Sequence, residues 1–439
     1  MALSCDVWSI AASFLGVQEL SSFACSCTIG QRLAHNRGIW RALLRTTSGV
    51  VSILEEGEQH PRSVFRALSM FSWRATLRSA RCVPSDDDDD GDGSLGGAAG
   101  SWSSRFLHRA AAVGNSTYVF GGKGNDGGRF YNDLWKFDDN DDAVGTGCSL
   151  AASRVAMLTD RAPPPRAAHS MVTIGAHLVV FGGLSHRQTY LNDVWAIDTR
   201  ACGAEMMAWT LLRSVRADTL RPEPRMGHSA NAMDGTSSFV IFGGSAPRRV
   251  YNDVRIFDLA TRCWRVVAPS GTAPSGRSGH AAVWLGQGRA PRTQLLIVGG
   301  NDLERTFSES FVLTFESAKF RNAAWSTLKT RSGVATPPPK IGHSAIAFGR
   351  WVVLSGGRNK HQATGEILWS RTLWIYDADA RVWRELPDVA CGARTGHCCV
   401  RSSDGTRIAL LGGLRAERDG ETGQHFHGLE SIVELSLDL

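Results

Sequence analysis

Six histidines recur along the chain, and each stands three residues after a basic side chain. The pairs are Arg105/His108, Arg166/His169, Arg225/His228, Arg277/His280, Lys340/His343 and Arg394/His397. Imidazole binds metals and transfers protons near neutral pH, so a cluster of such residues could form a metal or acid–base site. Equivalent positions in a repeated unit more often pack and hydrogen-bond the start of a strand. We therefore expect structural histidines, and we predict no catalytic residue, no metal site and no cofactor.

Two other segments imitate ligand-binding loops. Gly122, Gly124 and Gly127 match the GxGxxG pattern, but no helix is expected after them, and a dinucleotide site needs that helix N-terminus. The run at residues 86–90 is all Asp and precedes Gly91, as in the first half of a calcium loop. Its twelfth position is Gly97, which has no carboxylate. Neither segment predicts a nucleotide or calcium site.

Composition excludes further classes of protein. The 439 residues are 43% hydrophobic with a net charge of +6, and no apolar run approaches the length of a membrane-spanning helix. Ten cysteines occur without a CxxC pair, which indicates reduced thiols in the cytoplasm or nucleus. The basic residues form no long run, so we expect neither a nucleic-acid partner nor a membrane partner.

The histidine pairs belong to a longer repeat. A Gly-Gly pair follows each histidine after a short apolar run, and successive pairs are 56 to 61 residues apart, at residues 121–122, 182–183, 243–244, 299–300, 356–357 and 412–413. Most units then contain another apolar segment and a tryptophan, such as Trp209, Trp264, Trp325 or Trp383. Apolar runs separated by turn residues predict four short strands in each unit, which we name a to d.

This pattern resembles the kelch repeat, whose period is about 50 residues. The resemblance implies a six-bladed all-β propeller over residues 105–439, with four strands in each blade. The last unit ends after its third strand. We expect residues 71–78, which include Trp73, to supply the missing strand and close the ring, because an open edge would otherwise remain.

Residues 1–45 follow a different pattern. Val7, Ile10 and Phe14 have helical spacing, and glycines at 16, 30 and 38 are placed to end helices. We expect a small all-α module here and a helical connector over residues 46–70. The Leu-x-x-Asp-Val start, the Phe-Leu and Glu-Leu pairs, and the late Trp-Arg resemble an F-box, although Cys5 stands where that family usually has Pro.

An F-box implies that the chain is a non-catalytic substrate receptor of a Skp1–cullin–F-box ubiquitin ligase. The partners would be a Skp1-type adaptor, a cullin and a protein substrate. The residues expected to face Skp1 are Leu3, Val7, Ile10, Phe14, Leu15, Leu20 and Phe23. Two alternatives remain open at this point: a kelch interaction scaffold outside any ligase, and a propeller enzyme.

Basic residues gather between strands b and c of every unit. They are Lys123, Arg129, Arg187, Arg248, Arg249, Arg305, Arg358, Lys360, Arg415 and Arg418. All b–c connections share one face of a propeller, and binding residues tend to lie on such loops. We therefore predict a face that binds an acidic or phosphorylated substrate segment. Residues 79–104 are predicted to be an acidic, Gly/Ser-rich linker.

Overall fold

The computed structural model describes residues 78–80, 102–124, 128–139, 150–157, 161–201, 207–215, 220–286, 293–316, 320–361, 364–386, 393–401, 407–419, 423–428 and 432–436. All of them belong to one compact unit, Ala75–Ser436. The predicted helical module and its connector lie outside the described residues. No helix in the described part of the chain is long and apolar enough to cross a membrane.

Antiparallel sheets make up this unit, and we name each by its strands. Sheet β3–β7 contains β3 (Arg109–Val113), β4 (Ser116–Phe120), β6 (Leu134–Asp139) and β7 (Leu150–Arg154). Sheet β8–β12 contains β8 (Arg166–Ala167), β9 (Ser170–Ile174), β10 (His177–Ser185), β11 (Tyr190–Asp198) and β12 (Trp209–Leu211). Sheet β13–β18 contains β13 (Ser229–Ala232), β14 (Ser238–Phe242), β17 (Val254–Asp258) and β18 (Cys263–Val267).

The remaining large sheets follow the same order. Sheet β19–β23 contains β19 (Ser270–Gly271), β20 (Ala281–Trp284), β21 (Gln294–Val298), β22 (Ser310–Phe315) and β23 (Ala323–Thr327). Sheet β24–β29 contains β24 (Ser344–Phe348), β25 (Trp351–Ser355), β28 (Leu373–Asp377) and β29 (Val382–Leu386). Sheet β30–β1 joins β30 (Cys398–Arg401), β31 (Arg407–Leu411) and β34 (Ile432–Ser436) to β1 (Arg78–Ala80).

Short ribbons and turns link these strands. The ribbons pair β2 (Arg105–Phe106) with β5 (Lys123–Gly124), β15 (Ser245–Ala246) with β16 (Arg249–Val250), β26 (Arg358–Lys360) with β27 (Ile367–Trp369), and β32 (Leu414–Asp419) with β33 (Gly423–Gly428). Two 3-10 helices, η2 (His186–Gln188) and η3 (Thr199–Ala201), complete the elements.

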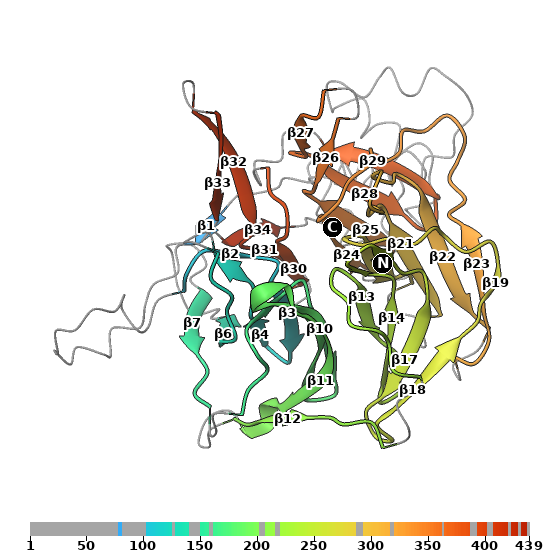
Figure 1. The fold of residues 1–439 in the computed structure, drawn as a ribbon. Helices are drawn as coiled ribbons and strands as arrows, with labels where there is room; N and C mark the ends of the chain where they lie inside the picture. The colour runs from blue at the N-terminus through green and yellow to red at the C-terminus, as the bar shows by residue number, and fades with distance from the viewer. Residues whose placement is uncertain are drawn as a thin grey trace, which may run out of the picture. The chain divides into compact units, whose positions relative to one another are not determined.

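The large sheets surround a common centre as a β-propeller. The innermost strands contact one another in the order β3, β9, β13, β20, β24, β30, and β30 contacts β3 again. Figure 1 shows β3, β13, β24 and β30 towards the middle, with β7, β12, β18 and β23 at the rim. Aromatic side chains pack between neighbouring sheets. The ring centroids of Phe120 and Trp209 are 5.0 Å apart, and those of Phe181 and Trp264 are also 5.0 Å apart. Burial of these aromatic side chains supplies much of the driving force for the propeller to form.

The Gly-Gly pairs connect each sheet to the next. The second glycine of a pair donates its N–H to the carbonyl of the next repeat cation, as from Gly122 to Arg166 at 2.8 Å. The series ends with Gly413, which donates to Arg105 at 3.0 Å and so joins the last repeat to the first. Gly121 has φ +65°, and a Cβ there would lie 2.8 Å from the Arg166 oxygen. Glycine is required because both the backbone conformation and the close approach exclude a side chain.

The fold class predicted from the sequence is wrong as stated. The described residues contain no α-helix, so they do not bear out an all-α module, and the large sheets are not six equal four-stranded blades. Strand β8 adds a fifth strand beside β10, and β19 adds a fifth strand in parallel beside β23. Both additions are two residues long and polar or small. Main-chain hydrogen bonds hold these two strands in their sheets, so no apolar pattern in the sequence predicts them.

The closing strand also differs from the prediction. β1 begins at Arg78 and ends at Ala80, whereas residues 71–78 were expected to pair. Ser79 stands opposite Val433 of β34. Aromatic and apolar residues favour residues 71–78 as a strand, but the strand that pairs is short and mostly polar. Trp73 lies outside the described residues.

Candidate functional site

Buried cations are the most regular polar feature of the propeller. Arg105, Arg166 and Arg225 are almost completely buried, and each forms a two-pronged ion pair with an aspartate between strands b and c: Arg105 with Asp133 at 2.6 Å, Arg166 with Asp193 at 2.8 Å, and Arg225 with Asp253 at 2.6 Å. Each guanidinium also donates to the carbonyl of the first glycine of the Gly-Gly pair. These groups hold two strands of a sheet together from inside.

Burial and charge act in opposite directions on these aspartates. Burial alone would raise the pKa of Asp193, but hydrogen bonds from Arg166 and its positive charge outweigh that effect and lower the pKa. The same balance lowers the pKa of Asp133 and of Asp253. The carboxylates therefore stay ionised and hydrogen-bonded to their arginines, and they are not free to act as general bases.

The repeat histidines are buried and neutral. Burial, together with the positive charge of the nearby repeat cation, lowers the pKa of His108, His280 and His343 to about 3. His280 Nε2 lies 2.9 Å from Ser229 Oγ of the preceding sheet. The repeat histidines pack between sheets, and His228, His280 and His397 each lie within hydrogen-bond distance of a serine hydroxyl. Within the described residues, no group of three or more His, Cys, Asp or Glu side chains is placed to hold a metal ion.

The carboxylate partner is lost in later repeats. Glu309 occupies the position of Asp133, because Gly299 donates to its carbonyl just as Gly121 donates to that of Asp133. Arg277 nevertheless bonds only to backbone carbonyls, and burial lowers its pKa to about 10. Lys340 donates to Ser370 Oγ at 3.3 Å, and burial lowers its pKa to about 8. The sequence signal was present, since the Asn-Asp before strand c in the first three repeats is replaced by Ser-Glu at residues 308–309 in the fourth.

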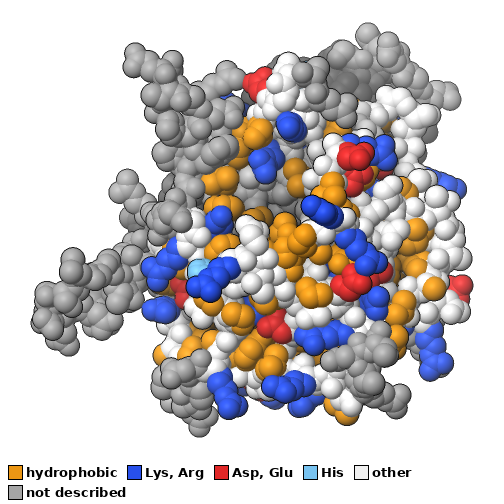
Figure 2. Space-filling model, viewed as in Figure 1, with side chains coloured by type: hydrophobic (Ala, Val, Ile, Leu, Met, Phe, Trp, Pro, Cys, Tyr) orange, Lys and Arg blue, Asp and Glu red, His pale blue; other side chains and the backbone are white. Residues whose placement is uncertain are grey.

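The predicted substrate-binding residues all lie between strands b and c of their repeats. In antiparallel sheets these connections share one end, which we call the b–c surface. Arg129, Arg187, Arg248, Arg249, Arg305, Lys360 and Arg415 are exposed there, and Lys123 and Arg358 are half-buried. Arg418 belongs to β32, but its side chain lies outside what the structure describes. Figure 2 shows Lys and Arg side chains spread across one face, with acidic side chains confined to small groups.

These cations are not equally available to a partner. Arg249 pairs with Glu223 at 2.8 Å, and Arg305 lies 3.8 Å from Asp302. In the described part of the chain, neither Arg358 nor Lys360 has a carboxylate within ion-pair distance. Burial lowers the pKa of Arg358. The β26–β27 ribbon therefore presents positive charge that no described carboxylate pairs with.

Apolar side chains accompany this charge. Leu303 is 66% exposed and Leu368 is 45% exposed, and both lie in b–c connections. Leu368 belongs to the β26–β27 ribbon, opposite Asn359. Exposed leucine beside cations is the composition of a protein-binding surface, because apolar area supplies affinity and charge supplies orientation. The sequence pattern predicts the cations of this surface but neither leucine.

Comparison with known families identifies the repeat. Residues 107–323 match the KLHDC2/KLHL20/DRC7 kelch-repeats domain, and residues 342–390 match the kelch motif. The chain carries kelch repeats. The resemblance predicted from the Gly-Gly pairs and tryptophans is thus confirmed for these residues. Kelch propellers act in protein–protein interaction, which agrees with the exposed apolar and basic residues of the b–c surface.

Several kelch-containing proteins are similar to this chain. Acyl-CoA-binding domain-containing protein 5 of Arabidopsis thaliana is 29% identical over 292 residues, covering 64% of this chain and 40% of that protein. Adagio protein 3 of Arabidopsis thaliana is 30% identical over 333 residues, covering 72% of this chain and 48% of that protein. The chain thus spans less than half the length of these two relatives.

F-box/kelch-repeat protein At1g51550 of Arabidopsis thaliana is 25% identical over 463 residues, covering 96% of this chain and 90% of that protein. Among solved structures, that of YjhT superimposes with a TM-score of 0.53 at 15% identity, covering 75% of this chain and 94% of the other. This structural likeness shows the fold alone.

Proposed function

We propose that the b–c surface of this kelch propeller binds an acidic segment of a partner protein. The observation that carries the proposal is the β26–β27 ribbon, where no described carboxylate lies within ion-pair distance of Arg358 or Lys360 and Leu368 is exposed. Cations without internal partners can form charge-assisted hydrogen bonds with carboxylates or phosphates at little internal cost.

We propose further that the chain is a substrate receptor of a Skp1–cullin–F-box ubiquitin ligase, acting in the cytoplasm or nucleus. Two observations support this role. The F-box-like pattern runs through residues 3–44, with Phe14 and Leu15 among the residues proposed to face Skp1. The alignment with the F-box/kelch-repeat relative covers 96% of this chain, so it extends into that segment. The protein would bind and position its substrate, and the chemistry of ubiquitin transfer would belong to other subunits.

Co-purification tests the ligase role. The full chain should retain a Skp1-type adaptor and a cullin, and the double variant Phe14→Asp, Leu15→Asp should lose both, because charge on a docking face is costly to bury. Capture of propeller partners should persist in that variant. Retention of partners without any Skp1 or cullin, in the unmutated protein, would identify a kelch scaffold outside the ligase and overturn the receptor proposal.

Charge reversal tests the b–c surface. Arg358→Glu with Lys360→Glu should abolish capture of the partner while leaving Skp1 binding intact. Arg249→Glu is the matched control, because Arg249 is already paired with Glu223 in the free protein. Arg249→Glu should therefore reduce capture of the partner less than the double reversal does. Unchanged capture by the double reversal would contradict the proposal.

A further inference from the structure

A second surface of the propeller is hollowed between two neighbouring sheets. This groove, of about 600 Å³, lies between the face of sheet β19–β23 and two turns of sheet β24–β29. Val312 and Ser326 stand opposite each other on that face. The two turns link β24 to β25 at Arg350 and β28 to β29 at Asp379 and Arg381. These turns lie at the end of their sheet opposite to the β26–β27 ribbon, so the groove is separate from the b–c surface.

The groove is open because the β28–β29 turn is charged. At the preceding contact, between sheets β13–β18 and β19–β23, Phe320 from the β22–β23 connection fills the space against Trp284 and Phe315. Arg265 also donates to the carbonyl of Phe320 at 2.8 Å. The β28–β29 turn has Asp379 and Arg381 instead, and neither side chain packs into the core.

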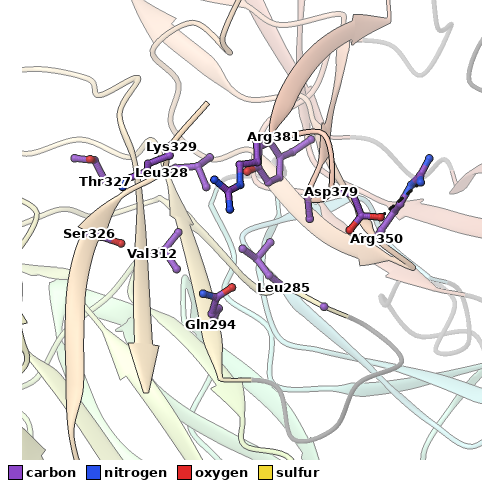
Figure 3. Close-up of a pocket in the computed structure, with 13 residues that line it drawn as sticks. Leu285, Gln294, Val312, Ser326, Thr327, Leu328, Lys329, Arg350, Asp379 and Arg381 are labelled. Carbon is purple, nitrogen blue, oxygen red and sulfur yellow. Dashed lines mark ion pairs between the residues drawn. The ribbon is translucent and has the colours of Figure 1, made fainter. Parts of the chain in front are cut away.

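Positive charge dominates the lining. Lys329, Arg350 and Arg381 face a single acidic lining residue, Asp379. Arg350 is already held 3.6 Å from both Asp377 and Asp379. Among the described residues, Lys329 and Arg381 have no carboxylate within ion-pair distance. Figure 3 shows the Arg381 guanidinium directed into the space between Leu328 and Leu285.

The other walls suit a peptide. Leu285, Val312 and Leu328 form an apolar side, while Gln294, Ser326 and Thr327 supply amide and hydroxyl groups. Apolar walls with a few convergent polar groups characterise ligand sites, and the volume lies within the range for such sites, roughly 300–1,000 Å³. Two unpaired cations beside an apolar wall complement a carboxylate next to an apolar side chain.

We propose that this groove binds an acidic peptide segment of a partner protein, with Glu or Asp carboxylates on Lys329 and Arg381 and an apolar side chain against Leu285 and Leu328. The interaction would be independent of the b–c surface. One propeller would then hold two partners, or two segments of one partner, at different places.

Fluorescence anisotropy with the full-length protein tests this site. The probe is a labelled peptide, Gly-Ser-Glu-Leu-Glu-Ser-Gly, which should bind, whereas the same peptide with Gln in place of Glu should bind at least about tenfold more weakly. A peptide with phosphoserine in place of Glu separates the two anion sources. Binding of the phosphopeptide without binding of the Glu peptide would overturn the carboxylate assignment.

Variants locate the bound probe. Lys329→Glu with Arg381→Glu should weaken binding by about tenfold or more. Arg331→Glu, an exposed neighbour outside the lining, and Lys360→Glu on the b–c surface should each change it less than about twofold. If the double reversal fails to fold, Lys329→Gln with Arg381→Gln replaces it, with the same expected direction. A loss of binding in Lys360→Glu alone would place the peptide on the b–c surface and overturn the groove proposal.

Discussion

At the scale of single residues, the propeller depends on charges held inside it. Arg166 is fully buried, and Asp193 and the Gly182 carbonyl satisfy its guanidinium. Removing one member of a buried pair leaves the other charge without a partner, which costs more than the pair itself contributed. The repeats that lack the aspartate show that a sheet can form without it, since Arg277 is held by backbone carbonyls.

Asp193→Ala should therefore lower the free energy of unfolding by about 3 kcal/mol, since Arg166 would keep its burial and lose its carboxylate. Glu309→Ala is the matched control at the equivalent position, where no side-chain bond to Arg277 exists, and should cost less than about 1 kcal/mol. Urea denaturation of both variants measures the difference. Equal losses would contradict the assigned role of the ion pair.

The buried histidines predict a dependence of stability on pH. Their pKa values are lowered in the folded protein, to about 3 for His108, His280 and His343, while the unfolded chain titrates near 6.5. As the pH falls below 6.5, only the unfolded chain takes up these protons, so stability falls. The slope is roughly 1.4 kcal/mol per pH unit for each such histidine.

Unfolding midpoints between pH 7.5 and 5.0 should show this loss before the carboxylates begin to protonate. His343→Gln should make the pH dependence shallower, because one titrating group is removed. A midpoint that does not change over this range would refute the prediction. Loss of stability only below about pH 4 would assign it to the carboxylates instead.

At the scale of elements, the Gly-Gly pair is the feature that joins each sheet to the next one around the propeller. It lies at or near the end of strand b and brings the backbone onto the next sheet. A second series of backbone bonds runs closer to the repeat histidines, where Gly279 donates to Gly227, Gly342 to Gly279, and Gly396 to Gly342, all within 2.8–2.9 Å. Both series use positions where φ is positive.

Gly243→Ala should be strongly destabilising, by at least about 3 kcal/mol, because a Cβ there lies 2.6 Å from the Arg277 oxygen and φ is +68°. Gly235→Ala has the same φ but open space around it. It should cost only about 1 kcal/mol, from backbone strain alone. Comparing their thermal unfolding midpoints separates the close approach from the conformation. Similar midpoints would mean that the contact with Arg277 is unimportant.

At the scale of the whole molecule, the ring is closed by two strands that lie far apart in the sequence. β1 pairs with β34, so Arg78–Ala80 complete a sheet whose other strands begin at Cys398. A ring in which each sheet packs on two neighbours should unfold as one unit, because an opened ring exposes the apolar faces of two sheets.

A chain shortened to residues 75–439 should unfold in one cooperative transition, whereas residues 81–439 should show a lower midpoint and a tendency to aggregate. The second chain lacks β1, so the edge of β34 is left unpaired. Differential scanning calorimetry and light scattering make the comparison. If the two chains behave alike, β1 does not stabilise the closed ring.

The kelch repeat follows from the sequence alone, because Gly-Gly pairs, apolar runs and tryptophans are local signals that recur in register. The cations of the b–c surface were also found from sequence, by their place between two strands. Tertiary structure alone decided which of them are neutralised, since Glu223 reaches Arg249 from another connection. Tertiary structure alone also determined where the short strands β1, β8 and β19 pair and where the groove beside Arg381 lies. Main-chain pairing and the packing of one sheet on the next bring together residues that share no local sequence pattern.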